Sequence, residues 1–105
     1  MKRLLLISAL GISLCTVSFA AEPTGETFAH TCSACHGTYG QLKNEAFVPL
    51  AGMNKQEFVA SMRAFRDLKR PTSIMSHIAQ GYNDEEINRM AEFFAGLESD
   101  KGEKK

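Results

Sequence analysis

The sequence lacks several features that mark well-known classes of protein. It has no tryptophan, only three prolines and only three cysteines among 105 residues, and its 12 basic residues are balanced by 12 acidic ones. Balanced charge argues against a nucleic-acid-binding protein that works through a basic surface. The length allows one small domain, which excludes a two-domain enzyme with a large substrate cleft of its own.

The one long apolar run lies at the N-terminus. Lys2 and Arg3 precede an apolar stretch at 4–17, and small residues follow at positions 18 and 20. This order is typical of a secretory signal peptide, so we predict a leader at residues 1–20 that is cleaved after Ala20. The stretch is shorter than the roughly 20 apolar residues that span a bilayer. We therefore expect a periplasmic protein with no membrane span in the mature chain.

Removal of the leader changes what the cysteines can do. Cys15 is lost with the leader, so Cys32 and Cys35 remain as a pair, and the mature chain has two more acidic than basic residues. A domain of this size has a core that barely offsets the conformational entropy of folding, and such domains usually need a cross-link or a metal. The role of the cysteine pair is therefore the central question.

The mature chain shows helical patterns and no alternation that would indicate a sheet. A first helix is expected from Thr24 to His36, where the glycines that follow end it. A second helix is expected to start after Asn54, which can form a capping box with Glu57. Pro71 is expected to close this second helix, because proline cannot continue it.

A third helix completes the expected fold. Asn83 and Glu86 form another capping box, and apolar residues recur at helical spacing as far as Leu97. The fold class is therefore all-α, with one domain at residues 21–97. The charged segment 98–105 lacks periodicity, and we expect it to be a mobile tail.

The motif that indicates a chemical function is Cys32-Ser33-Ala34-Cys35-His36. Residues three and four apart share one face of a helix, so both thiols and the imidazole are expected to point the same way. Each thiol can then bond one vinyl group of a porphyrin while His36 reaches the iron. The C-x-x-C-H pattern is read as a c-type haem attachment site, which predicts one covalent haem c.

Three other interpretations of the cysteine pair compete with haem. A redox disulfide of the thioredoxin type would follow a strand in a βαβ unit, and no such unit is indicated. A structural zinc site needs four protein ligands, and neither His30 nor His77 forms a second pair at similar spacing. A simple disulfide fits an exported protein but gives His36 no role. Covalent haem agrees with the export and with the helical pattern, and it gives His36 a role. If haem is the cross-link that the small domain needs, the chain without haem should be largely unfolded.

Met75 is the expected second ligand of the iron. It lies in the segment between the second and third predicted helices, 39 residues after His36, where the chain can wrap around a haem edge. His77 is the alternative, although in a helix it would point away when Met75 points inward. Met62 and Met90 are assigned to core packing, and Met53 to the hydrophobic contact at the start of the second helix.

With these residues, the chain resembles class I cytochromes c. The resemblance extends over nearly all of the mature chain, roughly 22–97. The resemblance implies that the first and last helices cross near a small residue and an aromatic one. Gly25 and Phe28 in the first helix, with Phe93 or Phe94 in the last, fit that crossing. It also implies that the backbone carbonyl of Pro49 holds the haem histidine and that Met75 is the methionine ligand.

A finer resemblance concerns the haem subunit of flavocytochrome c sulfide dehydrogenase. It is carried by residues 35–40 (CHGTYG) and 73–82 (SIMSHIAQGY). In that family a cytochrome docks on a flavoprotein that contains FAD and oxidises sulfide, and the haem accepts the electrons. This chain has a single haem motif and no glycine fingerprint for a dinucleotide, so an FAD would have to belong to another chain.

Two classes of function follow from the haem. The first is one-electron carriage, either as the cytochrome subunit of a sulfide dehydrogenase or as a free shuttle to a terminal oxidase or another acceptor. The second is a haem enzyme or ligand sensor, in which Met75 is absent from the iron or easily displaced. In neither class does the sequence indicate a catalytic site apart from the haem. A stripe of arginines at positions 63, 66 and 70 either meets the haem propionates or a partner, or is a solvated helix flank.

Overall fold

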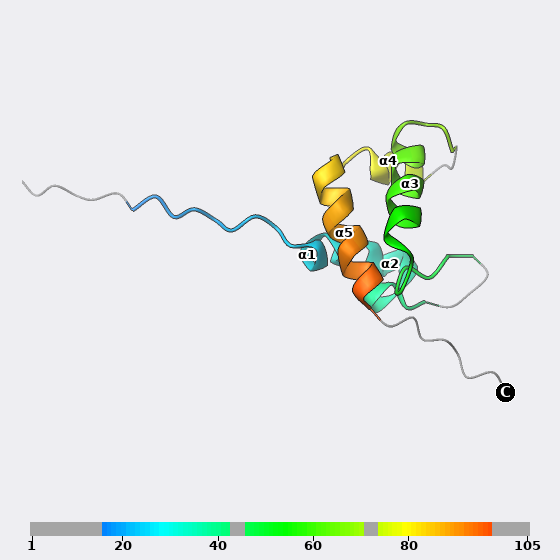
Figure 1. Cartoon of the computed structure of the whole chain (residues 1–105), viewed down its shortest axis with the longest axis horizontal. Coiled ribbons are helices and arrows are strands. Elements are labelled where there is room, and N and C mark those ends of the chain that lie inside the picture. The colour runs from blue at the N-terminus through cyan, green and yellow to red at the C-terminus, as the bar shows by residue number, and fades with distance from the viewer. Residues whose placement is uncertain (1–15, 43–45, 71–73, 98–105) are drawn as a thin grey trace, which may run out of the picture.

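A computed structural model of the chain describes residues 16–42, 46–70 and 74–97. Its elements are, in order, α1 (Gly25–Ala29), η1 (His30–Cys32), α2 (Ser33–His36), η2 (Thr38–Gly40), α3 (Lys55–Arg66), α4 (Met75–Ala79) and α5 (Asp84–Gly96). Every regular element within these ranges is helical, which confirms the predicted fold class (Figure 1). The predicted tail at 98–105 and most of the predicted leader lie outside the described residues, and cleavage after Ala20 stays a prediction.

The first predicted helix is present as three short helical pieces that follow one another directly. Thr24 caps α1, because its side-chain oxygen accepts a hydrogen bond from Thr27 N at 3.2 Å. A tighter 3₁₀ turn, η1, connects α1 to α2. Gly37 then ends α2 with φ at +80°, and a Cβ there would lie 2.7 Å from the backbone nitrogen of Leu42. Glycine is therefore required where the chain leaves the haem motif.

The second predicted helix begins as expected and ends earlier than expected. The side chain of Asn54 accepts hydrogen bonds from Gln56 N and Glu57 N, as an N-cap should. The prediction that Pro71 closes the helix is wrong, because α3 already ends at Arg66. Leu68 adopts a left-handed conformation with φ at +56°, and the amides at 69 and 70 both donate to Ala64 O. This turn ends α3 before Pro71, which lies outside the described residues.

A short helix, α4, stands where the sequence indicated only a connecting segment. It begins at Met75, packs against α3 and buries Ser76 and Ala79. Its five residues are too few to show a helical period, and Ile74 before it makes no side-chain cap bond. The local signals by which the other helices were predicted are therefore absent here, and α4 depends on packing against the rest of the chain.

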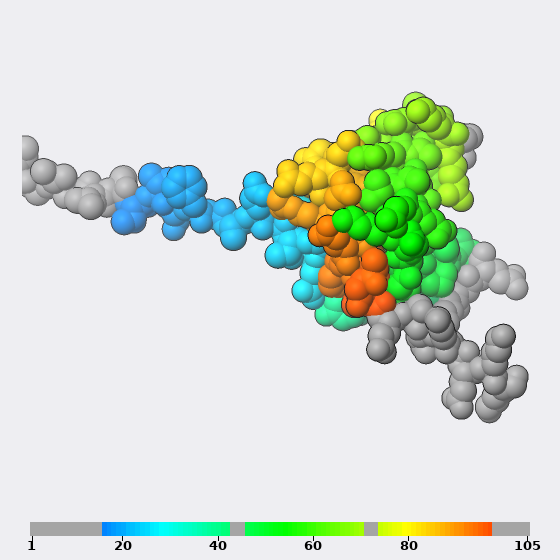
Figure 2. Space-filling model, in the orientation of Figure 1, coloured from blue at the N-terminus to red at the C-terminus, as the bar shows by residue number. Residues whose placement is uncertain are grey.

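The third predicted helix is confirmed in detail as α5. Its capping box is complete, since Asn83 Oδ1 accepts from Glu86 N at 2.9 Å and Glu86 Oε2 accepts from Asn83 N at 2.8 Å. The predicted apolar face forms the centre of the core, where Ile87, Met90 and Phe94 are fully buried. α5 lies beside α3 in the space-filling view and also packs against α1 (Figure 2). No helix within the described ranges is long and apolar enough to cross a membrane.

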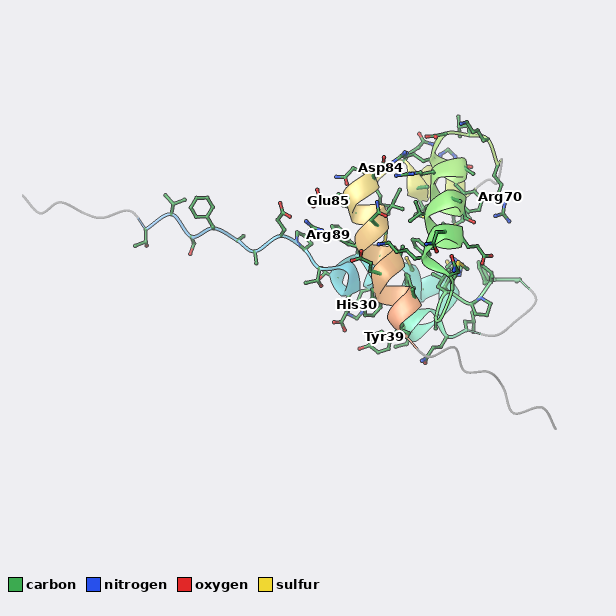
Figure 3. The ribbon with its side chains drawn as sticks, in the orientation of Figure 1. His30, Tyr39, Arg70, Asp84, Glu85 and Arg89 are labelled. Atoms are coloured by element: carbon green, nitrogen blue, oxygen red, sulfur yellow. The ribbon has the colours of Figure 1, made fainter. Side chains whose placement is uncertain are left out.

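The packing of α1 on α5 depends on a glycine, as the family resemblance implied. A Cβ at Gly25 would lie 2.1 Å from Arg89 O and 3.2 Å from Phe93 Cβ, so the two helix backbones are in direct contact. Arg89 of α5 also donates hydrogen bonds to Pro23 O and to the carboxylate of Glu22, just before α1, and it pairs with Glu85 within α5 (Figure 3). This crossing holds the start of the haem motif against the helix that carries most of the core.

We expect Gly25→Ala to destabilise the protein by about 1–3 kcal/mol, the usual cost of overpacking a close contact. The added methyl group would meet backbone atoms of α5, which cannot rotate away as a side chain can. Denaturant unfolding of the haem-loaded protein measures this change. Gly96→Ala is the matched control, because a Cβ at Gly96 meets nothing within 4 Å. Equal stabilities of the two variants would contradict the proposed helix contact.

Candidate functional site

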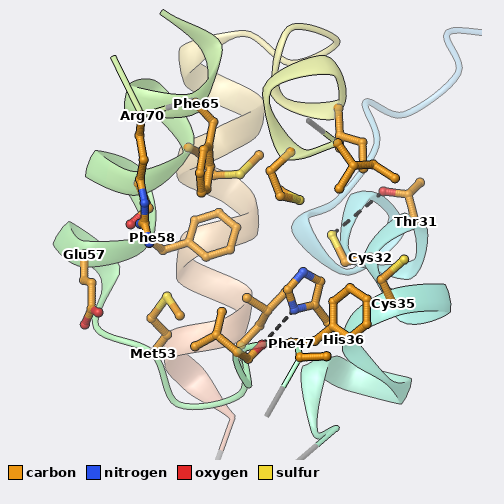
Figure 4. Close-up of a pocket in the computed structure, with 18 residues that line it drawn as sticks. Thr31, Cys32, Cys35, His36, Phe47, Met53, Glu57, Phe58, Phe65 and Arg70 are labelled. Carbon is orange, nitrogen blue, oxygen red and sulfur yellow. Dashed lines mark hydrogen bonds between the residues drawn. The ribbon is translucent and has the colours of Figure 1, made fainter. Parts of the chain in front are cut away.

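A cavity of about 390 Å³ opens between the haem motif, the loop that follows it, and helices α3 and α4 (Figure 4). Its lining is mainly apolar and comes from four parts of the chain. These are Thr31, Cys32, Cys35 and His36; Ala46, Phe47, Val48, Leu50 and Met53; Glu57, Phe58, Ser61, Met62, Phe65 and Arg70; and Ile74, Met75 and Ile78. The three residues of the sequence motif are therefore gathered on one wall of a hydrophobic cavity.

Cys32 and Cys35 both line this cavity as half-buried free thiols. Burial raises the pKa of the Cys32 thiol, and the side-chain contact with Thr31 only partly opposes this effect. Redox-active C-x-x-C pairs work with a lowered thiol pKa, because the thiolate is the reactive form. The surroundings of Cys32 therefore do not match a thioredoxin-type site.

His36 is held in one orientation by the backbone. Its Nδ1 lies 2.7 Å from the carbonyl oxygen of Val48, and the residue is only 8% exposed. A carbonyl can only accept, so Nδ1 must carry the proton, and the lone pair of Nε2 is left for a metal. The ring of Phe47 packs edge-on against the imidazole at 5.8 Å. A histidine oriented by a backbone carbonyl is typical of a metal ligand.

The residue that orients His36 is not the one that the sequence predicted. We expected the carbonyl of Pro49, and the structure places the carbonyl of Val48 there instead. Pro49 still contributes, since proline restricts the residue before it to extended conformations. The amide between Val48 and Pro49 has no N–H, so its only polar group is the carbonyl that faces His36.

Three methionines line the cavity rather than one. Met75, at the start of α4, is half-buried, but Met53 and Met62 also line the cavity, and the sequence interpretation had assigned these two to packing alone. Met90 is fully buried in the core and is not part of the lining. Helical spacing placed Met62 on the buried face of α3 correctly, yet it could not show that this face also borders the cavity.

The other candidate residues lie outside the cavity or at its edge. His30 and His77 are both exposed and do not line it. Arg63 and Arg66 bind the carboxylate of Asp84, with nitrogen–oxygen distances of 3.2 and 2.8 Å. These ion pairs lower the pKa of Asp84, Arg66 having the larger effect. The arginine stripe is therefore divided: two members hold α3 to the start of α5.

Arg70 is the third member of the stripe and the one that lines the cavity. Its guanidinium group lies 4.9 Å from the centre of the Phe65 ring, in a cation–π arrangement. Glu57 lines the same side of the cavity (Figure 4). The charged groups therefore stand at the edge of an otherwise apolar space, where they can remain hydrated.

The lining fits a haem on three counts. The walls offer apolar side chains to a flat apolar ring, both thiols border the same space, and Nε2 of His36 is free to bind iron. Met75 and two other thioethers supply soft sulfur, which suits iron in a c-type site. The residues present therefore agree with the cofactor that the motif predicted.

Comparisons with known proteins agree with the predicted cofactor. No family model matches the chain. Cytochrome c-554(548) of Halomonas halodenitrificans is 35% identical over 77 residues, which are 70% of this chain and 93% of the relative. The chain belongs to the cytochrome c family. Its cofactor is accordingly haem c, and it is an electron-transfer protein.

Two further relatives of this cytochrome are named for their redox partners. The cytochrome subunit of sulfide dehydrogenase from Chlorobaculum tepidum is 30% identical over 101 residues, covering 88% of this chain and 90% of the relative. The thiosulfate dehydrogenase electron acceptor of Stutzerimonas stutzeri is 39% identical over 69 residues. That match covers 63% of this cytochrome but only 32% of the relative's length. The predicted likeness to sulfide dehydrogenase cytochromes is confirmed at the level of sequence similarity.

Proposed function

We propose that this cytochrome is a periplasmic one-electron carrier with a single haem, and that it accepts electrons from a dehydrogenase that oxidises a reduced sulfur compound. The haem is bonded to Cys32 and Cys35 and ligated by His36 and Met75. The observation that carries this assignment is the bond between His36 Nδ1 and Val48 O, which leaves Nε2 free beside the two thiols. When bound, the haem supplies an iron that alternates between two oxidation states.

The residues around the cavity hold that iron in place and set its surroundings. The Val48 carbonyl keeps the imidazole of His36 in one tautomer and one orientation, and raises its basicity as a ligand. Phe47 packs against one edge of the imidazole, and Phe58 and Leu50 are buried on the cavity wall. An apolar wall disfavours the extra charge of ferric iron, and a methionine ligand acts in the same direction. We therefore expect a positive reduction potential.

We expect the haem propionates to lie at the charged edge of the cavity. Arg70 lines the cavity, and its own contact there is with an aromatic ring. Arg63 and Arg66 are already bound to Asp84, so Arg70 is the member of the stripe that we assign to the propionates. The propionates would then keep their charge near solvent and away from the apolar wall.

The dehydrogenase partner is supported by the relatives. Two proteins similar to this cytochrome are named as the electron acceptor or the cytochrome subunit of sulfur-compound dehydrogenases. The finer likeness at 35–40 and 73–82 favours the sulfide enzyme, whose flavin lies on a separate chain. Export to the periplasm after cleavage at Ala20 would bring the cytochrome to that partner.

A free electron shuttle is the second candidate. The observation that favours it is the match to cytochrome c-554(548), because the aligned region covers 93% of that relative. That relative is named as a cytochrome, with no dehydrogenase in its name. The same haem site serves both functions, so the two differ only in what the surface binds.

We expect the tagged cytochrome, purified from its native host at low salt, to bring down a second chain that contains FAD. Stoichiometric flavin absorbance alongside the haem would support the sulfide dehydrogenase subunit. The untagged strain is the control for adventitious flavoproteins. A cytochrome recovered alone, and still reducible by extracts supplied with sulfide or thiosulfate, would contradict the subunit and support the shuttle.

A further inference from the structure

A hydrogen bond between two side chains that are not assigned as iron ligands joins the two halves of the proposed haem site. The hydroxyl oxygens of Thr31 and Tyr82 lie 2.7 Å apart, although 51 residues separate them in the sequence. Thr31 immediately precedes Cys32 in the haem motif, and Tyr82 follows the helix that begins at Met75. The bond therefore connects the covalent side of the cavity to the methionine side.

The direction of this bond follows from the other bond of Thr31. The Thr31 hydroxyl donates to Phe28 O at 2.7 Å, which uses its only hydrogen. The hydroxyl of Tyr82 must therefore be the donor to Thr31, and Tyr82, Thr31 and Phe28 O form a directed chain. The ring of Tyr82 also packs edge-to-face on Phe28, with centroids 6.0 Å apart. Tyr82 is thus held against α1 and η1 by its ring and by its hydroxyl.

Tyr82 is in turn tied to α4. Its backbone N–H donates to Ala79 O at 3.2 Å, and Ala79 is fully buried in the last turn of that helix. α4 has only five residues, makes no side-chain cap bond at Ile74 and packs mainly against α3. A helix this short has little stability of its own. Its distance from the haem motif therefore depends on connections such as the one through Tyr82.

We propose that Tyr82 and Thr31 are positioning residues that hold α4, and with it Met75, against the haem-attachment segment. Neither residue is assigned as a ligand of the iron. Their bond sets how readily Met75 leaves its ligand position, because α4 must move away from the motif for the sulfur to withdraw. The inference rests on the proposed ligation by Met75.

Exogenous imidazole measures the effect, since it competes with a methionine for ferric iron. We expect Tyr82→Phe to raise the apparent affinity for imidazole about fivefold, the change in an equilibrium that one neutral hydrogen bond typically gives. The ring and its contact with Phe28 are kept in this variant. Thr31→Val should have the same effect, Thr31→Ser should restore wild-type behaviour, and the Tyr82→Phe, Thr31→Val double variant should not exceed either single change.

Tyr39→Phe is the matched control. The Tyr39 hydroxyl also makes a hydrogen bond, to Glu26 at 3.4 Å, but Tyr39 does not line the cavity or contact α4 (Figure 3). We expect its imidazole affinity to equal that of the wild type. Equal affinities in Tyr82→Phe and Tyr39→Phe would overturn the proposal.

Failure of the ligand assignment can be told apart from failure of this inference. Hydrogen exchange at the Ile78 amide, which donates to the carbonyl of the N-cap residue Ile74, reports on α4 without reference to the iron. Faster exchange in Tyr82→Phe, with a far-red methionine–iron absorption band that survives the loss of Met75, would contradict Met75 as ligand while keeping the hold on α4. A band that depends on Met75, with unchanged exchange and unchanged imidazole affinity in Tyr82→Phe, would contradict only the role of Tyr82.

Discussion

The double variant Cys32→Ala, Cys35→Ala is expected to lose its covalent haem and most of its helical circular-dichroism signal. Loss of a cross-link of comparable kind destabilises small domains by about 2–5 kcal/mol. The cavity of about 390 Å³ would also lose the apolar contacts that a bound haem makes with its walls. The free energy of unfolding of a small domain is only a few kcal/mol, so we expect the double variant to be largely unfolded.

Cys15→Ala is the control for this variant. Cys15 lies in the predicted leader and should be absent from the mature protein, so this substitution should leave the haem content, the helical signal and the mature mass unchanged. A native-like helical signal in the double variant would contradict the claim that haem supports the fold. A changed mature mass in Cys15→Ala would contradict the predicted cleavage.

Replacement of the second axial ligand is expected to have the next largest effect. Met75→Leu should abolish the far-red absorption band of the methionine–ferric iron bond and lower the reduction potential. The expected decrease is on the order of 0.1–0.2 V, a fraction of the ~0.8 V range over which axial ligands set haem potentials. The reduced variant should also bind carbon monoxide rapidly. Leucine conserves volume, so we expect the fold to be kept.

The same substitution at Met53 and at Met62 provides matched controls, since both side chains line the cavity. We expect both variants to keep the band and a potential close to that of the wild type. A band that survives in Met75→Leu but is lost in one of the other two variants would transfer the ligand role to that residue. Rapid carbon monoxide binding by the reduced wild type would instead favour the ligand sensor or enzyme.

Much of the fold could be predicted from local signals in the sequence. The capping box at Asn83 and the spacing of Ile87, Met90 and Phe94 are properties of neighbouring residues, and α5 shows both as expected. Gly25 at the crossing was predicted through the family resemblance. α4 could not be found in this way, because its five residues carry no period and no cap, and its position depends on α3.

In the site, too, the features set by neighbouring residues could be predicted, and those set by the folded chain could not. The motif placed both thiols and His36 on one wall of the cavity because they share one helical face. The acceptor for His36 was displaced by one residue, to Val48, because the orientation of a single peptide unit depends on the folded loop. The bond between Tyr82 and Thr31 spans 51 residues, and the approach of such distant side chains cannot be read from spacing.

The most direct test of the account is the intact mass and absorption spectrum of the exported wild-type protein. We predict the mass of residues 21–105 plus one haem, retained after acid–organic extraction that removes non-covalent haem, together with a Soret band. Peptide mapping should place the added mass on the segment that contains Cys32 and Cys35. A mass equal to that of the polypeptide alone, with no Soret absorption, would contradict the covalent haem on which the proposed function depends.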